Sequence, residues 1–285
     1  MKNSIPLVAF ALVIPVLSVA VVETTAEPPE KPKSVAKPVF SGLQAVGKRL
    51  DQIGVAIIKG KGPEIEKAWG AWQLPPTAPP KLADQIQKQF ENARTKLGDA
   101  GVTRLQNLGF GFRLFLLKSN QLVYRLEGFL LLDQKQASLI KFRGRRASGA
   151  IGPRKLKELL PTELKGPDRI FPEVFESLLK AVRSGERTRL TIADPDLVAK
   201  SMMLPPILVA DMRKQVAMVK LGFAATCQEL AKIEYDTVRI EIEDQSFLAR
   251  DAKGQSLGLL RGLFGVLDKK VIYVVGGFRP FPKSR

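Results

Sequence analysis

The chain of 285 residues has no histidine and a single cysteine, Cys227. Without histidine, the serine–histidine and cysteine–histidine nucleophile pairs, histidine general bases and the common zinc sites are excluded. With one cysteine, no disulfide can form within the chain, so its core has to be stable without one. Cys227 falls on the apolar side of a predicted helix, which favours a small buried hydrophobic residue over a reactive thiol.

Carboxylates remain, but their spacing does not define a site. Glu241, Glu243, Asp244 and Asp251 lie near one another in the sequence, yet the loop spacing of a calcium site is missing, so we interpret them as a solvated strand face. We therefore expect no metal and no other cofactor. An enzyme is the less favoured interpretation of this chain.

Aromatic residues make up only 7% of the chain. Trp69 and Trp72 are three residues apart on one predicted helical face, and Phe110, Phe112 and Tyr124 lie on the strands predicted next. Aromatic residues at this spacing usually pack in a core, so packing is the first interpretation. The alternative is that these five residues line a ligand pocket.

The first 26 residues have the layout of a secretory signal peptide. Lys2 precedes an uncharged apolar run from Ile5 to Val22, and small residues then permit cleavage after Ala20 or Ala26. We expect a secreted or periplasmic protein. The alternative is an uncleaved N-terminal helix that anchors the protein in a membrane, because the run is just long enough to cross one.

In the remaining chain, short sequence features recur in the same order, which predicts two tandem α+β repeats, residues 39–147 and 169–285. A flexible Pro/Lys/Glu spacer is predicted at residues 27–38, a basic linker with a short helix at 148–168, and a basic tail at the end of the second repeat. Four landmarks recur in the same order: Val39-Phe40 and Val174-Phe175, Leu74–Pro76 and Leu204–Pro206, Arg113 and Arg239, Leu132-Asp133 and Leu267-Asp268.

Hydrophobic periodicity predicts helices first and an antiparallel meander after them in each repeat. Apolar residues recur every three or four positions over residues 40–50, 82–97 and 209–230, and Asp194 is a predicted cap for a short helix. Strands are predicted at residues 110–116, 122–132, 137–143, 237–243 and 271–277. An excised fragment of residues 169–285 is expected to fold by itself if the repeats are separate domains.

This order of elements, together with the opening run VFESLLKAVRSG at Val174–Gly185, resembles the cystatin-like cone of the nuclear-transport-factor-two and SnoaL-like superfamily. The resemblance covers Val39–Arg146 and Arg169–Phe281. It implies a curved sheet that serves as a ligand pocket, a dimer surface or an enzyme site with an acidic base. The acid–base pairs of that superfamily often include histidine, which this chain lacks. Two α+β domains of another type are the alternative.

The net charge of +17 is unevenly distributed. Residues 36–150 carry 19 basic and 8 acidic side chains, whereas residues 169–285 carry 19 and 14. A basic run crosses the boundary between the first repeat and the linker, and such a run attracts polyanions. The candidate anion-binding residues are Lys141, Arg143, Arg145, Arg146, Arg154, Lys155 and Lys157.

The sequence thus predicts an exported, non-enzymatic binding or scaffold protein that contacts an anionic partner through this basic inter-repeat segment. An anionic cell-envelope polymer or lipid headgroups fit the expected compartment better than nucleic acid does, and a protein partner is a further option. The alternative function is a small-ligand pocket, with or without catalysis, inside one cone-shaped domain.

Overall fold

The computed structural model describes residues 37–69, 80–132, 137–147, 179–180, 183 and 191–282. The predicted signal peptide, the linker and most of the run Val174–Gly185 lie outside these residues, as does the spacer up to residue 36. Side chains are not described at a few positions within the ranges, including residues 37–44. None of the described helices is long and apolar enough to span a membrane.

Three helices open the described chain: α1 (Lys37–Lys59), α2 (Gly62–Trp69) and α3 (Leu82–Asp99). α1 begins two residues inside the predicted spacer and buries Val46, Leu50, Ile53 and Ile57, which are spaced three or four residues apart. The predicted stripe of α3 is confirmed, because Leu82, Ile86, Phe90, Ala93 and Leu97 are all buried.

A meander of three strands follows: β1 (Arg104–Lys118), β2 (Gln121–Leu132) and β3 (Ala137–Arg146). The turn between β1 and β2 is made by Ser119 and Asn120, whose φ angles are 50° and 62°. Two consecutive positive φ values are characteristic of the tightest β-hairpins. The gap between the strands predicted at residues 110–116 and 122–132 is therefore a tight turn.

The second half contains a short strand, β4 (Thr191–Ile192), then α6 (Pro195–Met202) and the long helix α7 (Pro206–Ala231). The Asp194 carboxylate accepts hydrogen bonds from the backbone N–H groups of Asp196 and Leu197, as predicted for a helix cap. The strands β5 (Thr237–Arg250), β6 (Ser256–Leu267) and β7 (Lys270–Pro280) complete the chain. β6 was not predicted from the sequence, and β7 is longer at both ends than the strand predicted at residues 271–277.

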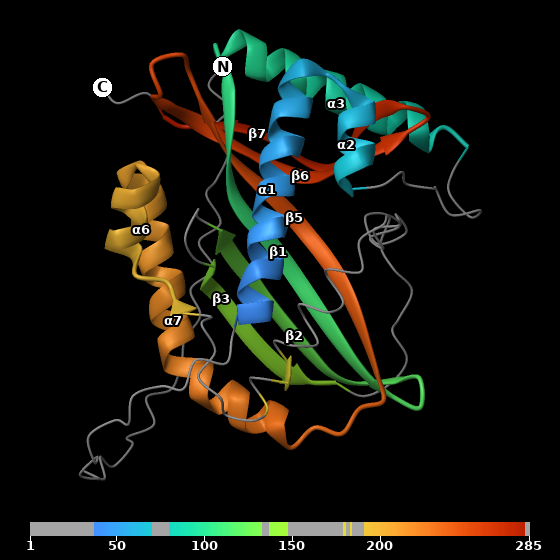
Figure 1. Cartoon of the computed structure of the whole chain (residues 1–285), viewed down its shortest axis with the longest axis vertical. Coiled ribbons are helices and arrows are strands. Elements are labelled where there is room, and N and C mark those ends of the chain that lie inside the picture. Colours follow the sequence, from blue (N-terminus) through green and yellow to red (C-terminus); the bar gives the residue numbers. More distant parts are fainter. Residues whose placement is uncertain are drawn as a thin grey trace, which may run out of the picture. The chain divides into compact units, whose positions relative to one another are not determined.

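The seven strands of the described residues belong to one sheet with the order β4-β3-β2-β1-β5-β6-β7 (Figure 1). The two predicted repeats meet at its centre, where β1 pairs with β5 in antiparallel orientation from Arg104–Arg250 to Leu117–Thr237. The order β3-β2-β1 on one side is mirrored by β5-β6-β7 on the other. Among these described strands, only β4 runs parallel to its neighbour, β3.

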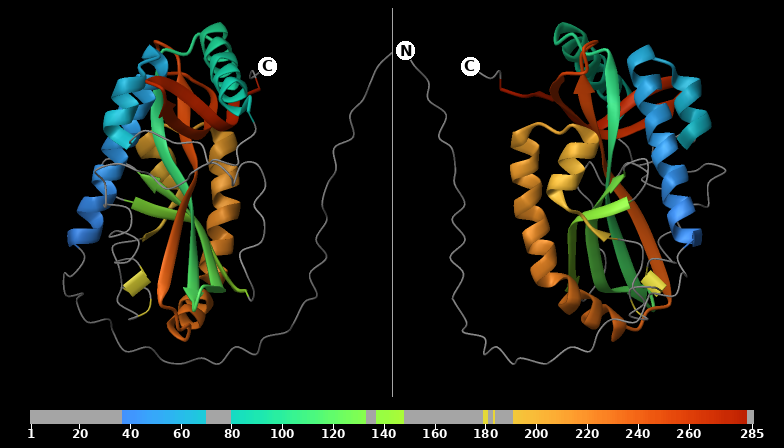
Figure 2. Two further views of the ribbon diagram at one scale, coloured as in Figure 1. Left: turned by 90° about the vertical axis from the view of Figure 1, so that its right-hand side faces the viewer. Right: turned by 60° about the vertical axis from the view of Figure 1, so that its left-hand side comes forward.

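Each of the long helices α3 and α7 packs against the half of the sheet that belongs to the other predicted repeat. α3 precedes β1 in the chain but packs against β7, whereas α7 precedes β5 but packs against β3. In both views of Figure 2, α1 lies on one side of the sheet and α6 with much of α7 on the other. The α+β class is confirmed. The duplication remains a prediction, and the reciprocal packing favours one cooperative unit over two separate domains.

Candidate functional site

Three of the predicted anion-binding residues share one face of β3. Lys141, Arg143 and Arg145 are exposed and alternate with Phe142 and Gly144, so they project to the opposite side from those two residues. Phe142 packs inward, with its ring centroid 5.1 Å from that of Phe223 on α7. Because the strand fixes the alternation, the three cations form a straight row.

Neighbouring strands extend this row across the sheet, because residues paired between strands lie on the same face. We call this surface the cationic face. Its basic members are Arg113, Arg125, Lys141, Arg143, Arg145 and Arg239, and its carboxylates are Glu127 and Glu241. The two transverse rows that define it are Arg143–Glu127–Arg113–Glu241 and Arg145–Arg125–Phe115–Arg239.

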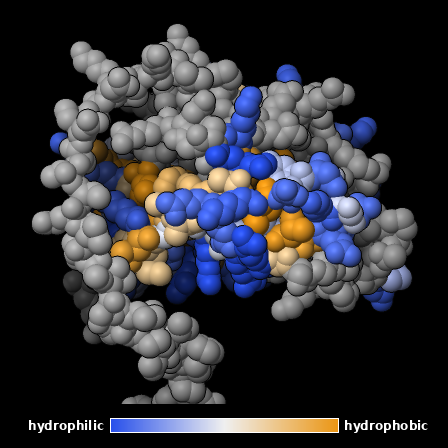
Figure 3. All heavy atoms as spheres, turned by 90° about the horizontal axis from the view of Figure 1, so that it is seen from below, coloured by the Kyte–Doolittle hydropathy of each residue, from blue (hydrophilic) through white to orange (hydrophobic). Residues whose placement is uncertain are grey.

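Two carboxylates offset only part of this charge. Glu127 is 3.1 Å from Arg125 and 3.5 Å from Lys141, and Glu241 is 3.2 Å from Arg239. Within the described chain, no carboxylate lies at ion-pair distance from Arg143 or Arg145. Seen from below, hydrophilic side chains gather across the middle of the described surface, beside apolar ones (Figure 3).

Glu127 holds the cationic face together. Burial alone would raise the pKa of its carboxyl group, but the charges of Lys141 and Arg125, with the hydrogen bond from Arg125, hold that pKa below its ordinary value. Glu127 is therefore ionised at neutral pH. Its side chain is 18% exposed and that of Arg125 24%, so this pair is shielded more than a surface ion pair.

Arg146 belongs to a different site. Its Nε donates a hydrogen bond of 3.0 Å to Oε1 of Glu229 on α7, and the Tyr124 hydroxyl donates one of 3.2 Å to Oε2. Burial and the nearby Glu229 charge raise the pKa of Tyr124, so the hydroxyl stays protonated as a donor. Glu229 thus ties the last turns of α7 to β2 and β3.

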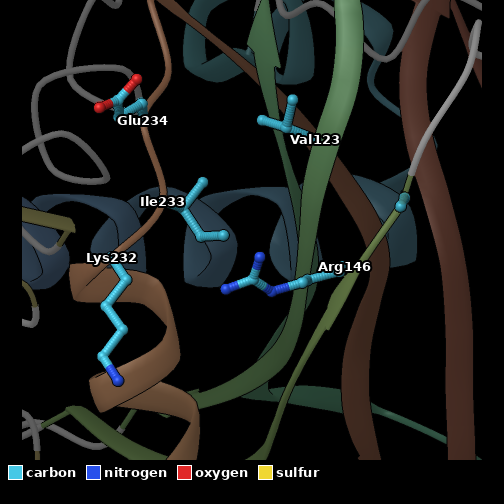
Figure 4. Close-up of a pocket in the computed structure, with 6 residues that line it drawn as sticks. Val123, Arg146, Lys232, Ile233 and Glu234 are labelled. Carbon is cyan, nitrogen blue, oxygen red and sulfur yellow. The ribbon is translucent and has the colours of Figure 1, made fainter.

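A surface pocket of about 510 Å³ opens beside this network, lined by Val123, Arg146, Ala147, Lys232, Ile233 and Glu234. Arg146 extends from β3 toward Ile233, whereas Lys232 and Glu234 point in other directions (Figure 4). Glu234 forms an ion pair with Lys118 at the β1–β2 hairpin. The pocket therefore places the guanidinium group of Arg146 beside the apolar side chains of Val123 and Ile233, with Lys232 and Glu234 at its edge.

The predicted pocket aromatics pack in the core. Phe110, Phe112 and Tyr124 are fully buried. The Phe112 ring covers Gly128, where a Cβ atom would be 2.3 Å from Phe112 Cζ, and the Tyr124 ring covers Gly144 in the same way. These rings therefore fill the space of missing side chains. Trp69 ends α2 without a described side chain, and Trp72 lies outside the described residues.

Cys227 is half-buried, and burial raises the pKa of its thiol, which agrees with the interpretation as a small hydrophobic residue. In the part of the chain that the structure describes, no group of three or more cysteine, aspartate or glutamate side chains could hold a metal ion.

Sequence analysis missed Arg113, Arg125 and Arg239 as members of the cationic face. Each of these arginines alternates with apolar neighbours in the sequence, which indicates the exposed face of a strand. The strand order that brings the three strands beside β3 cannot be read from the sequence. The other three predicted anion-binding residues, Arg154, Lys155 and Lys157, lie outside the described residues.

No protein-family model matches the chain, and no curated protein and no solved structure is significantly similar to it. Any proposal about its function therefore depends on its own residues and their geometry.

Proposed function

We propose that the protein is an exported, non-enzymatic binding protein that contacts an anionic partner through the cationic face. The observation that carries the proposal is the exposed row Lys141, Arg143 and Arg145 on β3, continued by half-buried arginines on β2 and β5. Alternate residues of a strand are about 6.6 Å apart and neighbouring strands about 4.8 Å. Such a grid presents several cations to several anionic groups at once.

The surroundings of the arginines also favour binding. Arg125 and Arg239 are held by Glu127 and Glu241, so they lose little side-chain freedom when a partner binds. Arginine forms paired hydrogen bonds with phosphate and carboxylate groups. A phosphate-bearing or carboxylate-bearing polymer of the cell envelope, or lipid headgroups, would suit this face in the compartment that the N-terminal sequence predicts.

A salt titration with inorganic polyphosphate tests the proposal. The parent is compared with Arg143→Gln/Arg145→Gln, and the matched control is Lys88→Gln/Lys96→Gln, which removes the same charge from exposed positions on α3. We expect the β3 variant to lower the slope of log affinity against log salt by about 2 and the affinity at low salt at least tenfold.

Equal losses in the two variants would mean that net charge alone attracts the polyanion, and the proposal would then be wrong. The same conclusion would follow if the parent did not bind. Glutamine is chosen over glutamate because a carboxylate at position 143 would lie opposite Glu127 and destabilise the sheet.

The second candidate function is binding of a small amphiphilic anion, and the pocket between β2, β3 and the end of α7 favours it. A ligand with one anionic group and an apolar body would match the Arg146 guanidinium and the two aliphatic side chains, with Lys232 at the edge of the pocket. A salt-insensitive affinity for such a compound that Lys232→Gln weakens, and Arg143→Gln/Arg145→Gln does not, would support it. A ligand-binding cone of the kind found in the resembling superfamily is part of this second proposal.

A further inference from the structure

α7 carries apolar residues on two faces. Its inner face buries Val209, Met212, Val216, Val219 and Leu230. Its outer face carries a second set of apolar residues, spaced three or four apart or adjacent except between Ala210 and Ala217, where the exposed Asp211 and Lys214 interrupt it. This outer stripe consists of Ile207, Ala210, Ala217, Met218, Leu221, Ala224 and Ala225, all exposed. Leu221 is 83% exposed, Met218 66% and Ile207 48%.

The fold does not require an apolar outer face at this position. α3 is the corresponding helix of the first half, since it also precedes a three-strand meander and packs against the last strand of the other half. Its exposed residues are polar or glycine throughout, from Asp84 and Lys88 to Lys96 and Asp99. The outer stripe of α7 is therefore a property of this helix and not of the architecture.

The apolar surface continues beyond the start of α7. Leu197 on α6 is 62% exposed and Met203, which follows α6, is 69% exposed. α6 packs against α7, so these residues and Ile207 lie at the same end of the helix pair. Large exposed apolar patches mark surfaces that bind a protein or a membrane.

Two lysines decide between these partners. Lys214 lies within the outer stripe, four residues after Ala210 and four before Met218, and Lys220 precedes Leu221. Neither lysine has a carboxylate at ion-pair distance among the described residues, whereas Arg213 is paired with Asp196 at 2.6 Å. A protein partner would have to supply a carboxylate to Lys214, because burying its charge unpaired is costly. At a membrane surface its ammonium group reaches anionic headgroups while the stem stays among acyl chains.

We propose that α7 docks in the plane of an anionic lipid membrane through its outer stripe, with Lys214 and Lys220 contacting the headgroups. An interfacial helix binds through an apolar face that enters the boundary of the acyl chains and through cations that attract anionic lipid. A second copy of the chain is a poorer partner, because both copies would carry a net charge of +17. The proposal goes beyond the anion binding proposed above and does not require the cationic face.

The test is sedimentation of the full chain with vesicles of phosphatidylglycerol and phosphatidylcholine in a 3:7 ratio, or of phosphatidylcholine alone. We expect Met218→Ser/Leu221→Ser to lower the partition coefficient at least tenfold. Lys214→Gln/Lys220→Gln should lower it about fivefold per lysine on the anionic vesicles only. The control Val55→Ser, at an exposed apolar position on α1, should leave it unchanged.

Two further measurements keep the result interpretable. Circular dichroism confirms that each variant is folded, and polyphosphate binding of Met218→Ser/Leu221→Ser should equal that of the parent even if the cationic face fails its own test. The proposal is overturned if the parent does not bind anionic vesicles or if the stripe variant binds them as the parent does. It is equally overturned if light scattering shows that the parent is a dimer and that Met218→Ser/Leu221→Ser is a monomer that still binds vesicles as the parent does.

Discussion

Glu127 is the residue at which stability and binding should change in opposite directions. It is the central anion of the cationic face, 3.1 Å from Arg125 and 3.5 Å from Lys141, with Arg143 and Arg113 opposite it on the neighbouring strands. Glu127→Gln keeps the shape of the side chain and removes its charge. The repulsion between the cations is then no longer offset by the Glu127 charge, but the face becomes more positive toward a ligand.

The burial of the Glu127–Arg125 ion pair determines how much stability Glu127→Gln should lose. Exposed ion pairs contribute up to about 1 kcal/mol, and breaking a fully buried pair costs about 3–5 kcal/mol. Because Glu127 is 18% and Arg125 24% exposed, we expect Glu127→Gln to lower the free energy of unfolding by about 2 kcal/mol. For a domain of this size that lowers Tm by about 4–8 °C. A charge about 4 Å from a bound phosphate contributes about 1 kcal/mol in water, so polyphosphate affinity should rise about fivefold at low salt.

The pH dependence provides a second check. The pKa of Glu127 in the folded protein lies below its ordinary value of 4.5, so the ionised carboxylate stabilises the folded state. This contribution is fully present above about pH 4.5 and is lost as the pH falls through the lowered pKa. The Tm difference between parent and Glu127→Gln should therefore be constant from about pH 6 to 8 and shrink below about pH 4.5.

Calorimetry across this pH range and polyphosphate titration measure the two effects. The control is Glu91→Gln on α3, which removes the same charge from an exposed side chain that accepts a hydrogen bond of 2.9 Å from Gln87. It should change stability by less than about 0.5 kcal/mol. The reasoning is refuted if Glu127→Gln is as stable as the control, or if its affinity for polyphosphate falls while it remains folded.

Two further substitutions test the fold by urea unfolding. Gly128→Ala places a Cβ atom 2.3 Å from Phe112 Cζ, and because that ring is fully buried we expect a loss of about 1–3 kcal/mol. In its control, Gly222→Ala within α7, the added Cβ atom has no neighbour within 4 Å, and the free energy of unfolding should rise by about 0.5–1 kcal/mol. Equal effects of the two substitutions would contradict the packing of Phe112. Asp194→Ala removes the hydrogen bonds to the N–H groups of Asp196 and Leu197 and should cost about 1 kcal/mol, so an unchanged midpoint would mean that the cap contributes nothing.

Elements with one buried face could be predicted from the sequence. In α3 every residue of the predicted stripe is buried. The prediction succeeded because the other face is polar, so the apolar residues recur with the helical period alone. β6 was missed for the opposite reason. Leu263, Phe264, Gly265 and Val266 are consecutive buried residues, and a strand covered on both faces shows no alternation.

Contacts between distant elements could not be predicted. The sequence places Arg145 and Arg146 side by side, and sequence analysis assigned both to one anion-binding segment. Strand alternation sends them to opposite faces, so Arg146 pairs with Glu229. Likewise, the periodic pattern of α7 predicted its buried face, but it did not show that the outer face would remain uncovered at Leu221.

The crossed packing of α3 and α7 has a consequence for how the protein is made. α3 ends at Asp99, but the strand that covers it begins only at Lys270, and the edge of β1 is closed by β5. The first half can therefore complete its core only when nearly the whole chain is available. Folding that depends on such distant contacts is slow. For a chain exported as we propose, this delay would keep it unfolded, and hence able to be threaded through a translocation channel, until synthesis is almost finished.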